Sequence, residues 1–82
     1  MGSPKNQSTE RRAFARKLGF AIRRARDEKD LSQDALAWNC EIHRAYMGVI
    51  ERGEQNITVL KLAQVCRGLG IKPSELLARI GN

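Results

Sequence analysis

The chain has 82 residues and a formal net charge of +6 at pH 7, and this length suits one domain with a modest core. No apolar run approaches the roughly 18 residues that span a bilayer, and the polar N-terminus lacks the apolar segment of a signal peptide, so we expect a cytoplasmic protein that does not bind membranes. Two cysteines make no disulfide framework, and we predict that Cys40 and Cys66 are small core residues in a reducing compartment.

The positive charge is concentrated near the start of the chain. Residues 1–29 hold nine Lys/Arg and three acidic residues, whereas the remainder holds six of each sign. A basic surplus attracts polyanions through counterion release, which favours a nucleic acid partner over an acidic protein. The alternative interpretation is a basic helix that serves solubility alone.

The first third of the chain predicts one helix behind a polar arm. Residues 1–8 are polar, and we expect a flexible arm before a single domain over residues 9–82. The helix is predicted from about Glu10 to Glu28, with Thr9 as its N-cap. Its core-facing residues recur at helical spacing, and they are Phe14, Leu18, Ala21, Ile22 and Ala25.

Residues 31–53 predict two short helices joined by a tight turn. The first opens at Ser32, whose hydroxyl can cap a helix, and ends at Cys40. The second runs from about Arg44 to Arg52 and stops at Gly53, a residue type common just past a helix end. Two such helices at a steep angle form a helix-turn-helix, whose second helix enters the major groove of DNA.

The second of these helices has two distinct faces. Met47 and Ile50 share one side and are predicted to be buried. Small and apolar residues with arginines occupy the opposite side and its flanks, and they are Arg44, Ala45, Tyr46, Gly48, Val49 and Arg52. Small residues allow close approach to a groove floor, and apolar ones can touch a thymine methyl group. An ordinary amphipathic surface helix would show the same pattern.

Two more helices are predicted after this pair. One runs from about Val59 to Arg67 and ends at Gly68 and Gly70, and its inward residues are Leu62, Ala63 and Cys66. The other begins at Pro73, a residue type well suited to a first helical position, and carries Leu76, Leu77 and Ile80. Because the chain has only two prolines and no alternating β-branched pattern, we predict an all-α fold.

Several spaced motifs resemble one family. L-S-Q-D-x-L-A from Leu31, I-x-R-x-Y-M-x-x-I-E-R-G from Ile42, and the Leu-Gly-Ile and Ser-Glu-Leu-Leu segments within residues 69–77 resemble the lambda-repressor/Cro/XRE class of helix-turn-helix regulators. The resemblance covers roughly residues 18–80 and implies a compact five-helix domain. E-R-G-E-Q-N-I-T from Glu51 and the R-A-Y pattern are most similar to the controller proteins of restriction–modification systems.

The resemblance and the side-chain chemistry together indicate which residues meet DNA. Arg44 is the first candidate for base recognition, because arginine can donate two hydrogen bonds to guanine. The other candidates for base contacts are Ala45, Tyr46, Val49 and Arg52. Phosphate contacts set the register of a protein on DNA without reading its sequence, and the candidates for them are Ser32, Gln33, His43, Gln55, Asn56 and Thr58. Thr58 can also cap the following helix, and a passive surface role for His43 stays open.

The resemblance also implies an Arg26–Glu51 ion pair that clamps the first helix to the recognition helix. Three positions depart from the family pattern. Trp38 stands where a charged residue is usual, and we expect it to pack locally against the arm rather than against a partner. Glu41 stands where glycine is frequent, and because a left-handed conformation would cost about 1 kcal/mol there, we expect a slightly different turn. His43 stands where Ser, Thr or Asp normally caps the helix.

The expected function is that of a sequence-specific transcription regulator. The resemblance implies that it binds double-stranded DNA at a palindromic operator as a homodimer, with two dimers on adjacent sites in an autoregulated operon. The expected dimer residues are Leu69, Ile71, Leu76, Leu77 and Ile80. The alternative is an antitoxin that binds a toxin and its own promoter, although a chain ending at Asn82 offers little room for a toxin-binding segment.

The residues give no indication of an enzyme. His43, the only histidine, has no Ser, Cys or Asp partner at a recognisable spacing. A metal site at Cys40 and His43 would lack a second pair of ligands, so we predict no metal, no cofactor and no small-molecule ligand.

Overall fold

The computed structural model describes the backbone of residues 4–81 and the side chains of residues 9–81. These residues form helices α1 (Pro4–Glu28), α2 (Gln33–Cys40), α3 (Arg44–Glu51), α4 (Val59–Leu69) and α5 (Pro73–Ile80). The described residues contain no strand, and the prediction of an all-α fold is confirmed. None of these five helices has an apolar stretch of the length that a bilayer-spanning segment requires.

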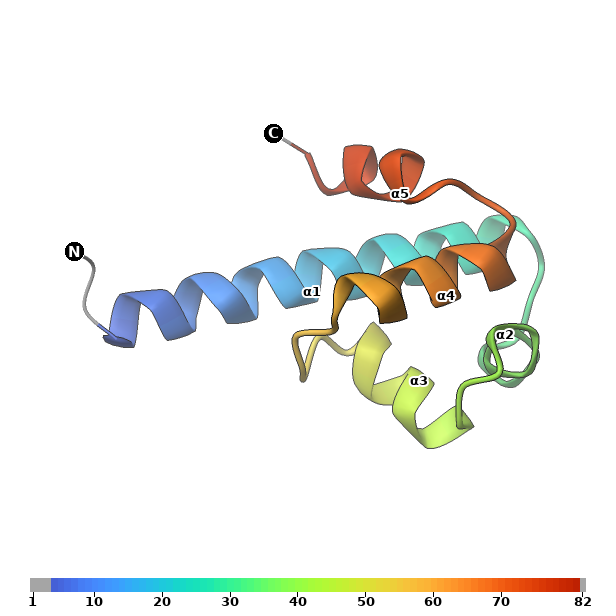
Figure 1. Ribbon diagram of the computed structural model, residues 1–82, viewed down its shortest axis with the longest axis horizontal. Coiled ribbons are helices and arrows are strands. Elements are labelled where there is room, and N and C mark those ends of the chain that lie inside the picture. Colours follow the sequence, from blue (N-terminus) through green and yellow to red (C-terminus); the bar gives the residue numbers. More distant parts are fainter. Residues whose placement is uncertain (1–3, 82) are drawn as a thin grey trace.

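The long helix α1 packs against two of the other four helices (Figure 1). It contacts α3 on one side and α5 on another, while α2 packs against both α3 and α4. The side chains that are almost fully buried come from all five helices, and they are Ile22, Leu36, Cys40, Met47, Val65, Cys66, Leu69 and Leu76. Both cysteines are free and buried, as predicted for core residues.

The start of α1 differs from its prediction. The helix begins at Pro4, six residues before Glu10, so it includes part of the predicted arm, while residues 1–3 lie outside the described part of the chain. Thr9 therefore lies inside α1 and is not its N-cap. Figure 1 shows the N-terminal part of α1 extending beyond the other helices. Phe14 is consequently 52% exposed, contrary to its predicted place in the core, which begins at Ala15.

The C-terminal helices also correct two predictions. Gly68 lies inside α4, which ends at Leu69 and is capped by the left-handed Gly70. The backbone of α4 packs so closely against Cys40 at Gly68 that a Cβ there would clash with Cys40 Sγ, which explains a glycine inside the helix. Ala63 is exposed, and Val65 takes its expected place in the core.

The prediction of the dimer surface is partly wrong, because two of its five residues are buried in the core. Leu69 and Leu76 are 2% and 0% exposed, so they belong to the core of a single chain and cannot meet a second copy. Ile71 and Ile80 are half-buried, and Leu77 is 42% exposed.

Candidate nucleic-acid interface

Helices α2 and α3 form the predicted helix-turn-helix, and local hydrogen bonds set its start. Ser32 has extended backbone angles, and its Oγ accepts a hydrogen bond from Ala35 N at 3.0 Å, which caps α2 as predicted. α2 then buries Leu36, Ala37 and Cys40 and ends at Cys40.

The turn between the helices is held by a contact that the sequence did not indicate. Glu41 adopts the left-handed conformation (φ 58°, ψ 40°), so the expectation of a different turn is wrong, and this residue bears the conformational cost. Gln64 of α4 donates hydrogen bonds from Nε2 to the carbonyl oxygens of Cys40 at 2.7 Å and Glu41 at 3.3 Å. This side chain holds the turn against α4.

His43 caps the recognition helix α3. Its Nδ1 accepts a hydrogen bond from Ala45 N at 3.2 Å, so an imidazole performs the role that a hydroxyl or carboxylate usually performs. The cap requires a lone pair on Nδ1, and Nε2 makes no hydrogen bond to any group within residues 9–81. His43 is thus not a passive surface residue.

A buried carboxylate fixes the other end of α3. Glu51 Oε2 accepts from Arg26 Nε at 2.8 Å, and Glu51 Oε1 accepts from Arg26 Nη2 and Gln33 Nε2, each at 3.0 Å. The side chains of Arg26 and Glu51 are only 12% and 3% exposed. Arg26 Nη1 also donates to the carbonyl oxygen of Leu31 at 2.9 Å. The ion pair predicted between Arg26 and Glu51 is therefore present.

The charges and polar atoms of this cluster are all paired within the protein. The hydrogen bond to Glu51 is the main cause that raises the pKa of Arg26, so the guanidinium stays charged. No buried side-chain nitrogen or oxygen in the described part of the chain lacks a hydrogen-bond partner. Gln33, predicted to meet a phosphate, thus uses its amide nitrogen to complete the clamp.

The outward face of α3 carries most of the side chains expected there. Ala45 and Arg52 are exposed, Tyr46 and Val49 are half-buried, and Met47 and Ile50 are buried as predicted. Gly48 is buried, contrary to its prediction, because Arg52 and Gln33 cover it. A Cβ at Gly48 would lie 3.0 Å from Arg52 Nη1 and 3.4 Å from Gln33 Oε1.

Both arginines of this face are engaged with carboxylates. Arg44 Nη1 lies 3.5 Å from Asp34 Oδ2, and the two side chains are 74% and 67% exposed. Arg52 donates to both carboxylate oxygens of Glu54, at 2.9 and 3.2 Å, and this hydrogen bonding lowers the pKa of Glu54. Exposed pairs of this kind are weak, so each guanidinium can exchange its carboxylate for a base edge or a phosphate.

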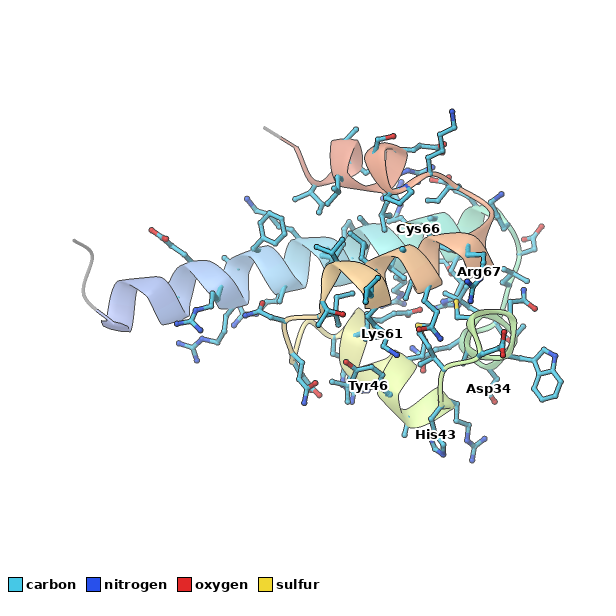
Figure 2. The ribbon with its side chains drawn as sticks, in the orientation of Figure 1. Asp34, His43, Tyr46, Lys61, Cys66 and Arg67 are labelled. Atoms are coloured by element: carbon cyan, nitrogen blue, oxygen red, sulfur yellow. The ribbon has the colours of Figure 1, made fainter. Side chains whose placement is uncertain are left out.

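Side chains from α4 support the face from the side. Lys61 Nζ lies 5.8 Å from the centroid of the Tyr46 ring and donates to Gln64 Oε1 at 3.2 Å. Figure 2 shows Tyr46, Lys61 and His43 around α3, with Asp34 on the neighbouring α2.

The loop after α3 presents the remaining phosphate candidates. Gln55, Asn56 and Thr58 are exposed. Thr58 Oγ1 accepts a hydrogen bond from Lys61 N at 3.0 Å and caps α4, so its structural role is present.

Two other expectations concern α2. Trp38 is 84% exposed, so the expected local packing is wrong. It borders a shallow depression with Ala37, Ile42 and His43 on the flank of the helix pair. Cys40 is fully buried, and burial raises the pKa of its thiol to about 11, which makes it a poor metal ligand. No group of three or more potential metal ligands occurs within residues 9–81.

The geometry defines a class of protein, and the comparisons agree with it. The family model described as "Helix-turn-helix domain" matches residues 17–79. Control protein C.BamHI of Bacillus amyloliquefaciens is 37% identical over 68 residues, which cover 79% of this chain and 84% of that protein. The chain belongs to the helix-turn-helix family of control proteins.

Solved structures share this fold. The restriction–modification controller protein C.AhdI from Aeromonas hydrophila matches with a TM-score of 0.73 and 35% identity, covering 76% of this chain and 94% of that one. The clp gene regulator ClgR from Corynebacterium glutamicum matches with a TM-score of 0.78 and 28% identity, covering 82% of this chain and 87% of that one. The prediction of a helix-turn-helix DNA-binding regulator is confirmed.

Proposed function

We propose that this protein is the autoregulatory controller of a restriction–modification operon and that it reads a palindromic operator as a homodimer. The observation that supports this most directly is the α3 face, where Arg44 and Arg52 flank short side chains. Similarity to C.BamHI and C.AhdI supports the operon.

Arg44 is the proposed base reader. It stands in the first turn of α3 and is held only by an exposed carboxylate, so its guanidinium is free to donate two hydrogen bonds to a guanine. Ala45, Tyr46 and Val49 supply shape and methyl contacts in this proposal, and Arg52 reaches a base or the backbone.

The proposed phosphate contacts flank this face. The exposed N-terminus of α2 at Ser32 offers backbone N–H groups to one strand. Gln55, Asn56 and Thr58 meet the other, and His43 offers Nε2 beside its cap.

A variant of Arg44 tests the reading of bases. Arg44→Ala should weaken operator binding by about 5- to 150-fold for each half-site, which corresponds to the roughly 1–3 kcal/mol of one bidentate contact, while binding to a scrambled duplex changes much less. Arg67→Ala is the matched control, because Arg67 is an exposed arginine on α4 and its substitution removes the same charge. Equal losses on both duplexes would remove Arg44 from the base-reading set.

The proposed dimer surface lies at the start of α4. Val59 and Leu60 are 81% and 83% exposed, which is unusual for neighbouring aliphatic residues, and they directly follow the loop after α3. A two-fold axis through this point would bring two copies of α3 to the same face of a duplex.

Two substitutions separate this surface from the one expected on α5. Leu60→Asp should convert the dimer to a monomer in sedimentation equilibrium, whereas Leu77→Asp should leave it dimeric. The reverse pattern would move the interface to Ile71, Leu77 and Ile80.

Selection from random duplex DNA tests the function as a whole. A two-fold symmetric motif with half-sites about one helical turn apart is expected for a dimeric regulator. The motif should occur upstream of the protein's own gene, next to a gene for a restriction enzyme. Because ClgR is a clp gene regulator, recovery of the motif at unrelated promoters would instead indicate a regulator of other genes.

A further inference from the structure

The charged side chains of α1 are segregated by helical face. Arg12, Arg16 and Arg23 are spaced by four and seven residues, so they share one edge of the helix, called here the basic edge. All three are exposed. Among the described residues, no ion pair involves any of them.

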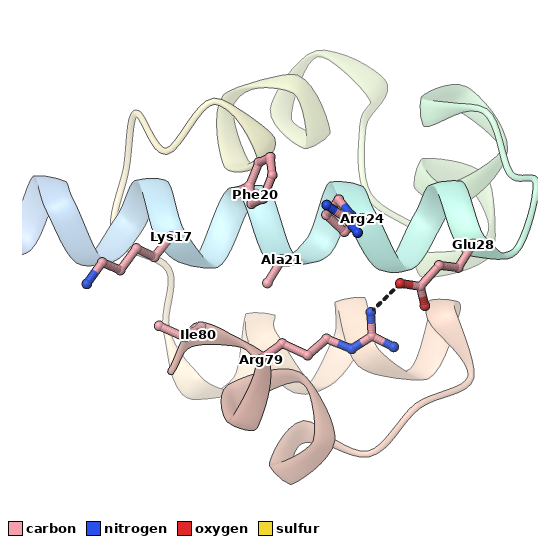
Figure 3. A pocket seen from close by; sticks show the side chains of 7 residues that line it. All are labelled: Lys17, Phe20, Ala21, Arg24, Glu28, Arg79 and Ile80. Atoms are coloured by element: carbon pink, nitrogen blue, oxygen red, sulfur yellow. Dashed lines mark hydrogen bonds and ion pairs between the residues drawn. The ribbon is translucent and has the colours of Figure 1, made fainter. Parts of the chain in front are cut away.

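A second side of α1 faces α5 and carries its own cations (Figure 3). There Arg79 of α5 donates to Glu28 at 2.9 Å, and Arg24 lies over the ring of Phe20 at 5.8 Å. Lys17 borders the same groove. On this side Arg79 is in an ion pair and Arg24 lies over an aromatic ring, whereas none of the three arginines of the basic edge is in an ion pair within residues 9–81.

The basic edge lies beside the DNA-facing part of the domain. Gly19, on the neighbouring strip of α1, packs against the backbone of Ile50 and Glu51 at the end of α3. Gly53 approaches so closely that a Cβ there would lie 2.5 Å from Arg16 Cα. The edge thus runs past the C-terminal end of the recognition helix.

A depression joins this edge to the loop after α3. Arg11, Arg12 and Ala15 line it from α1, and Gly53, Glu54, Gln55 and Asn56 line it from the loop. Glu54 also lines this depression and is paired with Arg52 in the unbound protein. A phosphate held by Gln55 or Asn56 would therefore lie next to guanidinium groups of α1.

We propose that the basic edge binds the phosphate backbone of DNA flanking each half-site. This inference rests on the proposed function and adds a contact that does not read sequence. The family model matches from residue 17, so Arg12 and Arg16 precede the matched segment. The edge lengthens the duplex that one protomer covers.

The salt dependence of binding measures this contact. Each phosphate contact adds about 0.9 to the slope of log K against log salt. Two arginines in each protomer of a homodimer make four contacts, so the double variant Arg12→Ala/Arg16→Ala should lower the slope by about 3.6 on both operator and scrambled duplexes. Its melting temperature should not change, because both side chains are exposed. Arg12→Lys/Arg16→Lys should retain most of the slope.

A matched double variant on the other side of α1 is the control. Lys17→Ala/Arg24→Ala removes the same two charges and should leave the slope nearly unchanged. Equal reductions for the two pairs would show a general effect of net charge and overturn the proposal, as would no reduction for either. If the unmodified protein selects no motif from random duplex DNA, the proposed function is wrong. If it selects a motif but the Arg12→Ala/Arg16→Ala variant keeps the same salt slope, only the proposal for the basic edge is wrong.

Lengthening the duplex gives a second readout. Operators extended by about half a helical turn beyond the half-sites should bind the unmodified protein more tightly than minimal operators. The Arg12→Ala/Arg16→Ala variant should gain nothing from the extension. A gain of the same size in both proteins would also contradict the basic edge.

Discussion

The two ends of the recognition helix are held in different ways. The C-terminal end is fixed by Glu51, which is 3% exposed and accepts hydrogen bonds from Arg26 and Gln33. The N-terminal end has one cap at 3.2 Å from His43, and Arg44 beside it is 74% exposed.

This difference shows how a small domain divides support from recognition. Buried charge-assisted hydrogen bonds are strong, and here they fix the orientation of α3 relative to α1. Exposed polar contacts are weak, so side chains at the N-terminal end can rearrange when a groove replaces water. The recognition helix is therefore fixed where it touches its own protein and adaptable where it meets DNA.

The largest expected effect comes from breaking the fixed end. Glu51→Gln should lower the free energy of unfolding by about 3 kcal/mol, because it removes the buried counter-charge of Arg26 and leaves only the exposed Asp27, 3.5 Å from Arg26 Nη1. Thermal and urea unfolding measure this change. Glu54→Gln is the control, because its pair with Arg52 is exposed and should alter the melting temperature little. An unchanged stability in Glu51→Gln would contradict the clamp.

A smaller effect is expected where α1 and α3 touch. A Cβ at Gly19 would lie 2.6 Å from the carbonyl oxygen of Ile50, so Gly19→Ala should force the helices apart. Overpacking costs about 1–3 kcal/mol, which exceeds the gain of up to about 1 kcal/mol in helix propensity. The midpoint of unfolding in urea should be lower for Gly19→Ala. A raised midpoint would mean that α1 and α3 are not tightly packed at Gly19.

Removing the cap tests the adaptable end. His43→Ala should cost about 1 kcal/mol or less, because one N–H group of α3 loses its partner. His43→Ser should restore most of the loss, since a hydroxyl can accept the same hydrogen bond. Amide hydrogen exchange at Ala45 reports the cap directly, and slow exchange in His43→Ala would assign no role to the imidazole.

The smallest expected effect is a stabilisation in the turn. Glu41→Gly should relieve about 1 kcal/mol of left-handed strain, and the greater freedom of glycine in the unfolded chain should reduce the net gain to about 0.5 kcal/mol. Glu41→Ala keeps the strain and should bring no gain. A lower melting temperature for Glu41→Gly would show that the Glu41 side chain stabilises the fold by more than its left-handed backbone destabilises it.

Most helix boundaries could be predicted from the sequence because their determinants are local. Ser32 and Thr58 cap the helices that follow them, Gly53 has a positive φ after α3, and Pro73 opens α5. Each of these signals acts within one helical turn. The start of α1 was missed because a polar segment carries no strong signal that excludes a helix.

The side-chain contacts of the site were less predictable. The Arg26–Glu51 pair was expected only through resemblance to a family. The roles of Gln33 and Gln64 were missed because their partners lie 18 and 24 residues away, and a single sequence does not show which distant groups meet. The exposure of Phe14 and the burial of Leu69 likewise depend on where neighbouring helices end.

The helices, the helix-turn-helix and the basic character of the first third of the chain could be read from the sequence. These features follow from caps, periodicity and composition, which operate over a few residues. The packing of distant segments is what leaves some apolar residues free for a partner and some arginines free for DNA. Whether a side chain has a partner depends on which distant segments pack beside it. Leu76 is buried and Leu60 is exposed to solvent. Arg26 pairs with Glu51, whereas Arg12 has no carboxylate partner among the described residues.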